Sequence, residues 1–355
     1  MAAGTAFITC TFTNGKTFVY KMKNATDWQA GGEYTYTVSL ATARGYIIED
    51  DGSYTVYNAD GLMNIAELVN GGKTDINITL DKNIDLTGKA WTPIGTDYDN
   101  SYKGTFDGGG HTITGLTFTT NDEFAGLFGW LNRAGTVKNV VMEGVQITSN
   151  QIYGGSIGGV VGSSWGTIEN CSVSGSISGT VYVGGVVGVQ IGGSITGCSS
   201  SATVKGMVDV GGVAGQTNSS ATLTACYATG NVTLEIAPKK NIAGGGLVGM
   251  NAGSRGLLAC YATGNVTSTG SSTGQVHIGG FLGNNYTTVT AGYWKNNHEQ
   301  GIGYNKEGIA PEATKVDGSV VTWKKAVDAM NTALQAARSE WRYELKGALP
   351  TLRKQ

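Results

Sequence analysis

A short unit, two apolar residues between two glycines, occurs six times and constrains the fold of this 355-residue chain more than any other feature. Successive copies begin 33, 26, 27, 34 and 34 residues apart. A recurring period of this length is typical of repeat architectures, in which each repeat contacts only its neighbours. The copies are Gly126–Gly129, Gly159–Gly162, Gly185–Gly188, Gly212–Gly215, Gly246–Gly249 and Gly280–Gly283.

A second segment with strand character follows each copy after a polar loop, as at Gly166–Val173 and Gly193–Ser200. Its most regular form, Cys-Tyr-Ala-Thr-Gly-Asn-Val, occurs unchanged at 226–232 and 260–266. Two β-rich segments per period, with no helical pattern between them, indicate one solenoid coil per repeat. A propeller blade would need about four strands and roughly 40 residues, and the periods of this chain are too short for that. The sequence therefore predicts an all-β fold, a right-handed parallel β-helix (β-solenoid).

The cysteines follow the same period. Four of the five fall at one position of consecutive coils, where Val140 stands one coil earlier and Gly292 one coil later. We expect them to be reduced and buried, because directly stacked neighbours give awkward geometry for a disulfide. Disulfides or metal binding are the alternatives, and Cys10 lies outside the column. The four are Cys171, Cys198, Cys226 and Cys260.

The chain divides into four predicted segments. Residues 1–45 read as an antiparallel β-hairpin segment with strands at 6–12, 17–21 and 34–40. Residues 46–120 form an N-terminal cap with a short helix and the first coil, and residues 121–295 form the repeated coils. Residues 296–355 form a C-terminal cap with a helix at 323–337 and a strand at 341–345. We expect both caps to cover the open edges at the ends of the stack.

Three motifs resemble a known family. The glycine-bounded units, the segment Phe106–Leu116 (FDGGGHTITGL) and Trp91–Gly95 (WTPIG) are similar to GLUG-repeat proteins. Residues 14–17 and 28–38 are similar to the closing strands of fimbrillin-like domains. The resemblance implies a surface or adhesin-like protein of gut Bacteroidetes, and it transfers no catalytic residues.

Composition argues against several classes of partner. The formal net charge is only −2, which gives no electrostatic attraction to nucleic acid. No apolar run is long enough to cross a bilayer, so we expect no membrane insertion in this segment. The location expected is the cell surface, attached to the outer membrane, or the secreted fraction.

Catalysis is not expected. Between residues 126 and 290 the only acids are Glu143, Glu169, Asp209 and Glu235, and no carboxylate pair recurs on a shared face. We therefore predict no enzyme activity and no cofactor or metal. One alternative is that Asp107 and His111 form a catalytic pair, but a turn in which Asp107 caps backbone amides is the expected structure. A second alternative is a calcium loop at 97–100, although its residues lack the regular ligand spacing of a known calcium loop. Lys239 and Lys240 are expected at a solvated corner.

One predicted surface could carry function. Tyr227 and Tyr261 each follow a column cysteine, and Tyr293 follows Gly292. If the preceding residues point inward, these three rings point outward and stack on one face. Such a row predicts a sugar-binding platform, and a ladder that shields the coil edges is the alternative.

The function expected is non-catalytic adhesion or ligand binding at the cell surface. The partner would be a host or microbial glycan or glycoprotein, or another surface protein. The alternatives are a carbohydrate-active enzyme, a polysaccharide lyase or hydrolase, and a structural stalk.

Overall fold

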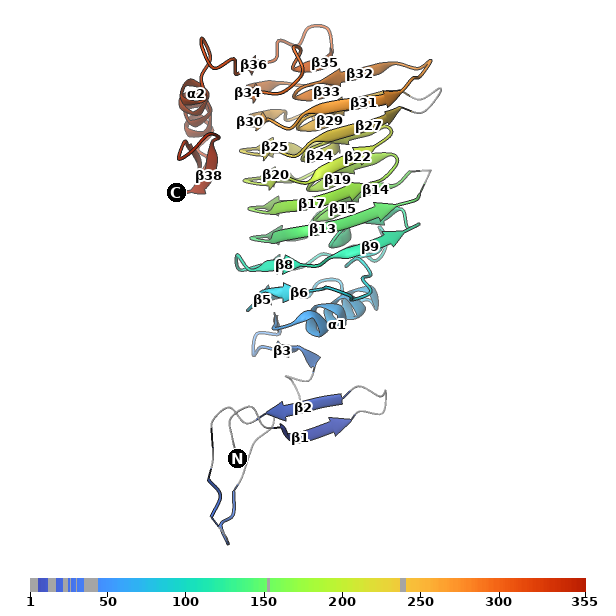
Figure 1. The fold of residues 1–355 in the computed structure, drawn as a ribbon, viewed down its shortest axis with the longest axis vertical. Coiled ribbons are helices and arrows are strands. Elements are labelled where there is room, and N and C mark those ends of the chain that lie inside the picture. Colours follow the sequence, from blue (N-terminus) through green and yellow to red (C-terminus); the bar gives the residue numbers. More distant parts are fainter. Residues whose placement is uncertain are drawn as a thin grey trace.

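The fold is described from a computed structural model, which covers residues 6–11, 17–21, 25, 27–29, 31–34, 44–151, 154–236 and 241–355. These residues are predominantly β, with two helices among them. Parallel strands lie in sheets that run along one axis, coil upon coil (Figure 1). This arrangement is consistent with the predicted parallel β-helix, while the handedness stays a prediction.

One coil shows the plan. In it, four strands run in order around the axis and each pairs in parallel with its equivalent in the next coil, as Ile168 does with Ile195. Because hydrogen bonds join equivalent strands of successive coils, the repeat period sets the register. The strands of this coil are β14 (Ser156–Gly158), β15 (Val161–Ser164), β16 (Thr167–Glu169) and β17 (Ser172–Ser178).

Three sets of parallel strands build the coil stack. The first corner sheet contains β10 (Phe124–Ala125), β14, β18 (Tyr182–Gly184), β23 (Asp209–Gly211), β28 (Ile242–Gly245) and β32 (Val276–Gly279). The second corner sheet contains β11 (Phe128–Leu131), β15, β19 (Val187–Gln190), β24 (Ala214–Thr217), β29 (Val248–Asn251), β33 (Leu282–Asn285) and β35 (Ile302–Asn305). The flank sheet contains the remaining coil strands in three adjoining rows.

The rows of the flank sheet share strands where they adjoin. The first row is β4 (Tyr54–Val56), β5 (Ile78–Leu80), β7 (Thr105–Asp107), β12 (Thr136–Lys138), β16, β20 (Ser194–Thr196), β25 (Thr222–Thr224), β30 (Leu257–Ala262) and β34 (Val289–Trp294). The second row is β6 (Ile84–Asp85), β8 (Thr112–Thr114), β13 (Val141–Ser149), β17, β21 (Ser199–Ser200), β26 (Tyr227–Ala228), β30, β34 and β36 (Ala313–Lys315). The third row is β9 (Thr117–Thr120), β13, β17, β22 (Thr203–Gly206), β27 (Val232–Ile236) and β31 (Val266–Gly270).

The repeated glycine-bounded units form the corner between the two corner sheets. Their first apolar residues are fully buried in one column, and from Val160 to Leu247 the backbone N–H of each donates to the carbonyl oxygen of its equivalent in the next coil, which confirms the predicted alignment. A Cβ on Gly162 would lie 2.8 Å from the carbonyl oxygens of Gly129 and Ser156, so the close approach of the two sheets requires glycine here. The column is Leu127, Val160, Val186, Val213, Leu247 and Phe281.

The cysteine column is also confirmed. All four thiols are free and buried, and the Sγ of Cys198 accepts a hydrogen bond from the backbone N–H of Cys171 at 3.4 Å. Gly292 pairs with Cys260 in register, as predicted. The side chain of Cys10, in β1, lies outside the described residues. Each column residue follows a left-handed residue that bends the strand inward: Asn139, Asn170, Gly197, Ala225, Ala259 and Ala291.

A second buried column, which the sequence analysis did not predict, is polar. Thr217 Oγ1 donates to Asn251 Oδ1 at 2.9 Å, and the amide of Asn251 donates to Asn285 Oδ1 at 2.8 Å. The Asn285 amide continues the chain to Asn305 Oδ1 at 2.8 Å. Such hydrogen-bonded ladders satisfy buried polar groups and fix the register of the coils that they join.

The N-terminal cap lies where it was expected. Helix α1 (Ala59–Asn70) starts at Asn58, whose side chain accepts from the N–H of Gly61 at 2.9 Å. Its buried apolar face covers the first coils (Figure 1). The antiparallel pair β3 (Tyr46–Ile48) and β4 precedes it.

Residues 1–45 are described in part. Strands β1 (Ala6–Thr11) and β2 (Thr17–Lys21) pair antiparallel, as predicted, and lie beyond the capped end of the stack (Figure 1). The third predicted strand, at 34–40, lies almost wholly outside the described residues.

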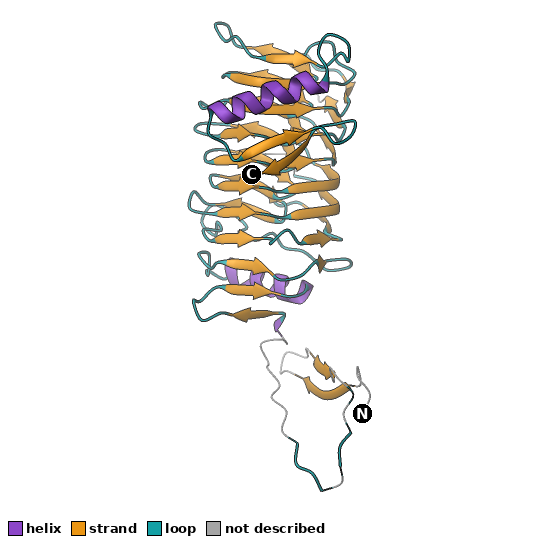
Figure 2. Ribbon diagram, turned by 90° about the vertical axis from the view of Figure 1, so that its left-hand side faces the viewer, coloured by secondary structure: helices purple, strands orange, loops and turns teal. Residues whose placement is uncertain are grey.

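The position expected for the C-terminal cap is wrong. Helix α2 (Trp323–Ala336), β37 (Trp341–Glu344) and β38 (Thr351–Lys354) form a clasp that lies along the flank of the stack, not across its last coil (Figures 1 and 2). The last coil instead receives β35 and β36 as added parallel strands. The apolar face of the clasp is buried against apolar residues of the flank sheet, among them Ala259, Tyr261 and Ala291.

Candidate functional site

The three predicted tyrosines form one row on the flank sheet. Tyr227 pairs with Tyr261, and Tyr261 pairs with Tyr293, in neighbouring coils. The rings of Tyr227 and Tyr261 stack with centroids 4.9 Å apart and planes within 3° of parallel. The predicted alternation is therefore confirmed: the cysteines point into the coils and the tyrosines point out.

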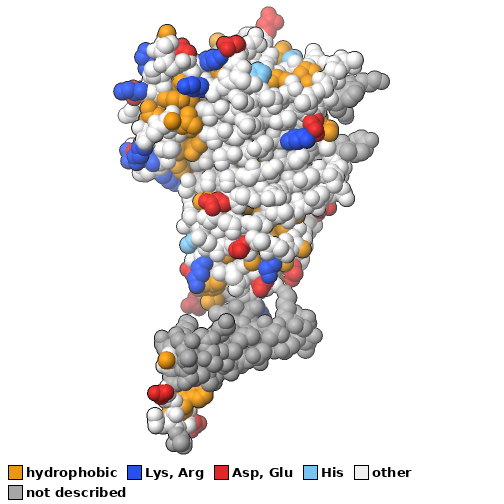
Figure 3. Space-filling view, viewed as in Figure 1, with side chains coloured by type: hydrophobic (Ala, Val, Ile, Leu, Met, Phe, Trp, Pro, Cys, Tyr) orange, Lys and Arg blue, Asp and Glu red, His pale blue; other side chains and the backbone are white. Residues whose placement is uncertain are grey.

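The row is not an open platform: the expected exposure is wrong for Tyr261 and Tyr293, and Tyr227 is half-buried. Tyr261 is fully buried and Tyr293 is 9% exposed, because the clasp lies over them. Trp323 of α2 packs edge-on against Tyr261 with centroids 5.1 Å apart, and Tyr343 packs on the same ring at 5.8 Å. Figure 3 shows apolar side chains gathered where the clasp meets the stack. In this arrangement the central ring serves the apolar contact that holds the clasp.

Polar contacts fix the clasp in register with the coils. The hydroxyl of Tyr343 donates to the carbonyl oxygens of Ala259 at 3.0 Å and Cys226 at 3.3 Å. The hydroxyl of Tyr261 donates to the carbonyl oxygen of Pro350. Lys354 reaches Glu169 at 2.8 Å, but this ion pair is partly exposed and adds little stability.

Small residues make the seat of the clasp. The left-handed positions before the cysteine column become Gly197, Ala225, Ala259 and Ala291 where the clasp lies, and the three alanines belong to its apolar contact. A Cβ on Gly197 would lie 2.3 Å from the Trp341 ring. The switch from asparagine to alanine along this column was the sequence signal that could have located the clasp.

The row ends in hollows on both sides of the clasp. Tyr293 lines a cavity of about 480 Å³ between the last coil and the alanine-rich side of α2. Burial raises the pKa of Tyr293, and the neighbouring Glu312 adds to the rise. At the other end, Tyr227 lines two hollows of about 210 Å³ each, one of them bounded by Trp341. Tyr227 and Tyr293 therefore border hollows, whereas Tyr261 lines none of the three.

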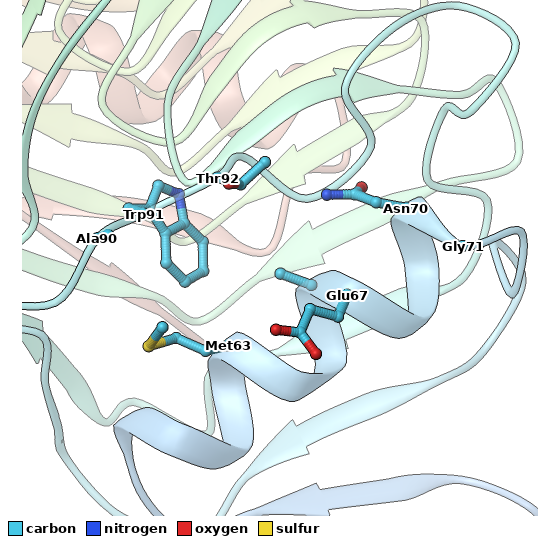
Figure 4. Close-up of a pocket in the computed structure, with 8 residues that line it drawn as sticks. Met63, Glu67, Asn70, Gly71, Ala90, Trp91 and Thr92 are labelled. Carbon is cyan, nitrogen blue, oxygen red and sulfur yellow. The ribbon is translucent and has the colours of Figure 1, made fainter. Parts of the chain in front are cut away.

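Another cavity, of about 380 Å³, lies between α1 and residues 90–92. Figure 4 shows the Trp91 ring over the helix, beside Met63 and Glu67. Trp91 donates to the carbonyl oxygen of Gly126 at 3.2 Å, and the Asn70 amide donates to that of Pro93 at 3.0 Å. The Asn70 amide and the Trp91 indole therefore hold the N-terminal cap in place.

The remaining predicted polar positions form turns. Asp107 accepts from the N–H of Gly109 and from the Asn139 amide, each at 2.9 Å. These contacts confirm the predicted capping turn and not the alternative of an Asp107/His111 catalytic pair. Asp97 accepts from the backbone N–H of Asp99 at 3.0 Å and of Asn100 at 2.9 Å. Hydrogen bonds, mainly from Asn100, lower the pKa of Asp97. Lys239 and Lys240 lie outside the described residues.

Parts of the chain are similar in sequence to known proteins. Residues 153–178 and 179–205 match the GLUG motif. Halomucin of Haloquadratum walsbyi is 31% identical over 209 residues, which cover 53% of this chain and 2% of halomucin. A candidate Gly-rich membrane protein of Evansella cellulosilytica is 33% identical over 129 residues, covering 34% of this chain and 14% of that protein. The chain thus spans only a small part of these curated relatives.

A solved structure shares the fold. The crystal structure of a candidate immunoglobulin A1 protease from Bacteroides ovatus aligns with a TM-score of 0.59 over 86% of this chain and 93% of that chain. At 20% sequence identity this likeness concerns the fold alone. In the part of the chain that the structure describes, neither helix has the length and hydropathy needed to cross a membrane.

Proposed function

We propose that this chain is a non-catalytic ligand-binding segment of a cell-surface protein, built on a right-handed parallel β-helix, with a glycan or glycoprotein as ligand. The GLUG motifs support a surface protein. So do the curated relatives, one of which is named as a halomucin and the other as a membrane protein. Outer-membrane attachment, a source in gut Bacteroidetes and a fimbrillin-like relation of residues 1–45 stay predictions.

The distribution of carboxylates is the observation that favours binding over hydrolysis. Glu169 is paired with Lys354, and Glu235 is paired with Lys205 at 2.7 Å, so both serve surface ion pairs. Glycoside hydrolysis needs two carboxyl groups that flank one bond, about 5–9.5 Å apart. In the described coils, the acids between residues 126 and 290 lie on separate strands, and Asp209 lies on the first corner sheet.

The test is a binding assay coupled to product analysis. The purified chain is incubated with mucin and with soluble polysaccharides, binding is measured by calorimetry, and the sugars are analysed by size afterwards. We expect weak, saturable binding, with Kd in the millimolar to high-micromolar range, and unchanged chain lengths. Shortened sugars would favour the carbohydrate-active enzyme. The absence of binding to every sugar would favour the structural stalk.

A further inference from the structure

A second group of outward-facing side chains lies along the corner, away from the clasp. At this corner a residue of the first corner sheet can lie opposite a residue of the second corner sheet, across the glycine-bounded unit. His277 and Asn284 are such a pair: Nδ1 of His277 lies 2.6 Å from Oδ1 of Asn284. Because an amide oxygen can only accept, the imidazole donates, and the Asn284 amide nitrogen keeps its donors. Within the described part of the chain that nitrogen has no partner.

Asp209 lies in the same column as His277, with Ala243 between them in register. Two strand spacings of about 4.8 Å place Asp209 roughly 10 Å from His277 along the axis. Asp209 is only 7% exposed. Of the residues that the structure describes, none gives its carboxyl group a hydrogen bond or an ion pair.

A buried carboxyl group without a partner is unusual in a folded protein, because desolvation penalises its charge. Burial raises the pKa of Asp209 to about 7. The strain of keeping such a group is characteristic of functional sites, where folding stability is given up for a ligand contact. Asp209 therefore calls for a partner that the chain itself does not supply.

Exposed aromatic rings lie beside His277, at the other end of this column from Asp209. Tyr304 is 39% exposed and stacks on the His277 ring, with centroids 5.0 Å apart and planes 21° from parallel. Tyr286 is 36% exposed, and its ring centroid lies 5.7 Å from that of Tyr304. Burial raises the pKa of Tyr286, and the neighbouring Tyr304 and then Asp209 add to the rise.

We propose that Asp209, His277, Asn284, Tyr286 and Tyr304 form a subsite for a neutral oligosaccharide that runs along the stack axis. The exposed rings receive the apolar face of a sugar, and the amide of Asn284 and the carboxyl group of Asp209 bind its hydroxyls. This assignment rests on the proposed function and gives it a site separate from the tyrosine row.

The chemistry of the subsite favours a neutral sugar over the other ligands. A uronic or sialic acid would bring a second negative charge toward Asp209, and no described lysine or arginine is paired with that carboxyl group to offset it. A lysine side chain from a protein could pair with Asp209, but it would leave the Asn284 donors without an acceptor. A polyhydroxylated ligand both donates and accepts, so it satisfies both groups.

The experiment compares four proteins on an array of neutral oligosaccharides of hexoses and N-acetylhexosamines, with uronic-acid oligosaccharides of equal length and a lysine oligopeptide alongside. We expect Tyr304→Ala to weaken neutral-sugar binding about 3- to 10-fold, as the loss of one ring contact implies. Asp209→Ala should weaken it about 10- to 100-fold, because a hydrogen bond to an ionisable group is lost. Tyr98→Ala is the control, since Tyr98 is 65% exposed and lies outside the subsite.

The possible outcomes separate the two proposals. If the wild-type protein binds sugars and both Tyr304→Ala and Asp209→Ala bind them equally well, the subsite is refuted while the proposed function stands. If the wild-type protein binds the lysine peptide through Tyr304 and binds no sugar, the ligand class is refuted. If it binds neither, the proposed function itself fails. A cooperative thermal unfolding transition in each variant shows that it is folded.

Discussion

Replacing Tyr343 with alanine is expected to lower the free energy of unfolding of the clasp by about 3–5 kcal/mol, the usual cost of truncating a buried aromatic side chain. Tyr343 is 2% exposed, packs on Tyr261 and donates to two backbone carbonyl oxygens of the stack. Its loss removes ring contact and hydrogen bonds together. The measurement is denaturant unfolding, followed by tryptophan fluorescence, to which Trp323 and Trp341 of the clasp contribute.

The coil stack itself should remain folded in this variant, because its strands pair with one another and not with the clasp. Circular dichroism should therefore keep its β signal while the clasp becomes sensitive to protease. Tyr343→Phe is the matched control: it keeps the ring and removes the hydroxyl, so it should cost only about 1 kcal/mol. Equal losses in the two variants, or loss of the whole β signal in Tyr343→Ala, would contradict this description of the clasp.

Replacing Asp209 with asparagine is expected to stabilise the protein at pH 8 and to change little at pH 4. Burial raises the pKa of Asp209 from 3.8 to about 7 in the folded state. Between these values the folded state binds more protons than the unfolded state, so stability falls as the pH rises. Above pH 7 the full free-energy cost of ionising the buried carboxyl group is present. A shift of about three units corresponds to a cost on the order of 4 kcal/mol, and asparagine, which does not ionise, avoids it.

The measurement is the denaturant midpoint of wild type and Asp209→Asn at pH 4 and pH 8. The exposed acid Glu143, replaced by glutamine, is the control and should leave the difference between the two pH values as it is in wild type. Parallel changes with pH in wild type and Asp209→Asn would mean that the carboxyl group is solvated or paired in solution.

The repeat made the interior of the stack predictable. When the same unit recurs every 26 to 34 residues, equivalent positions must stack, so Val186 falls beside Val213 and Cys198 beside Cys226. The outward direction of Tyr261 followed from alternation alone. Local signals also predicted a short helix in the N-terminal cap, which the structure has as α1, with Asn58 as its N-cap and its end at Asn70.

The docking of the clasp could not be predicted in the same way. Its sequence occurs once, so no period relates Tyr343 to Ala259, which lies 84 residues earlier. Alternation says that Tyr261 points out of the coil, but it does not say whether solvent or another segment lies beyond. The small residues Gly197 and Ala225 mark where a segment could dock, but they do not say which segment it is.

The corner subsite was hidden for a different reason. Asp209 stood out in the sequence only as one of few acids in the repeats. Its meaning depends on burial and on neighbours from other coils, such as Tyr286, which lies two coils away along the chain. The glycines of the repeated unit let the two corner sheets approach each other closely, and this approach sets how near Asp209 lies to residues across the corner. The repeat period alone does not reveal that distance.

The accessibility of the tyrosines to nitration in the native protein tests this account most directly. Tetranitromethane reacts with exposed phenol rings, and mass spectrometry of peptides reports each site. We expect rapid modification of Tyr98, Tyr286 and Tyr304, which are 65%, 36% and 39% exposed, and protection of Tyr261 and Tyr343, which are 0% and 2% exposed. Modification of Tyr261 as fast as Tyr98 would show that the clasp does not cover the tyrosine row, and would contradict the account.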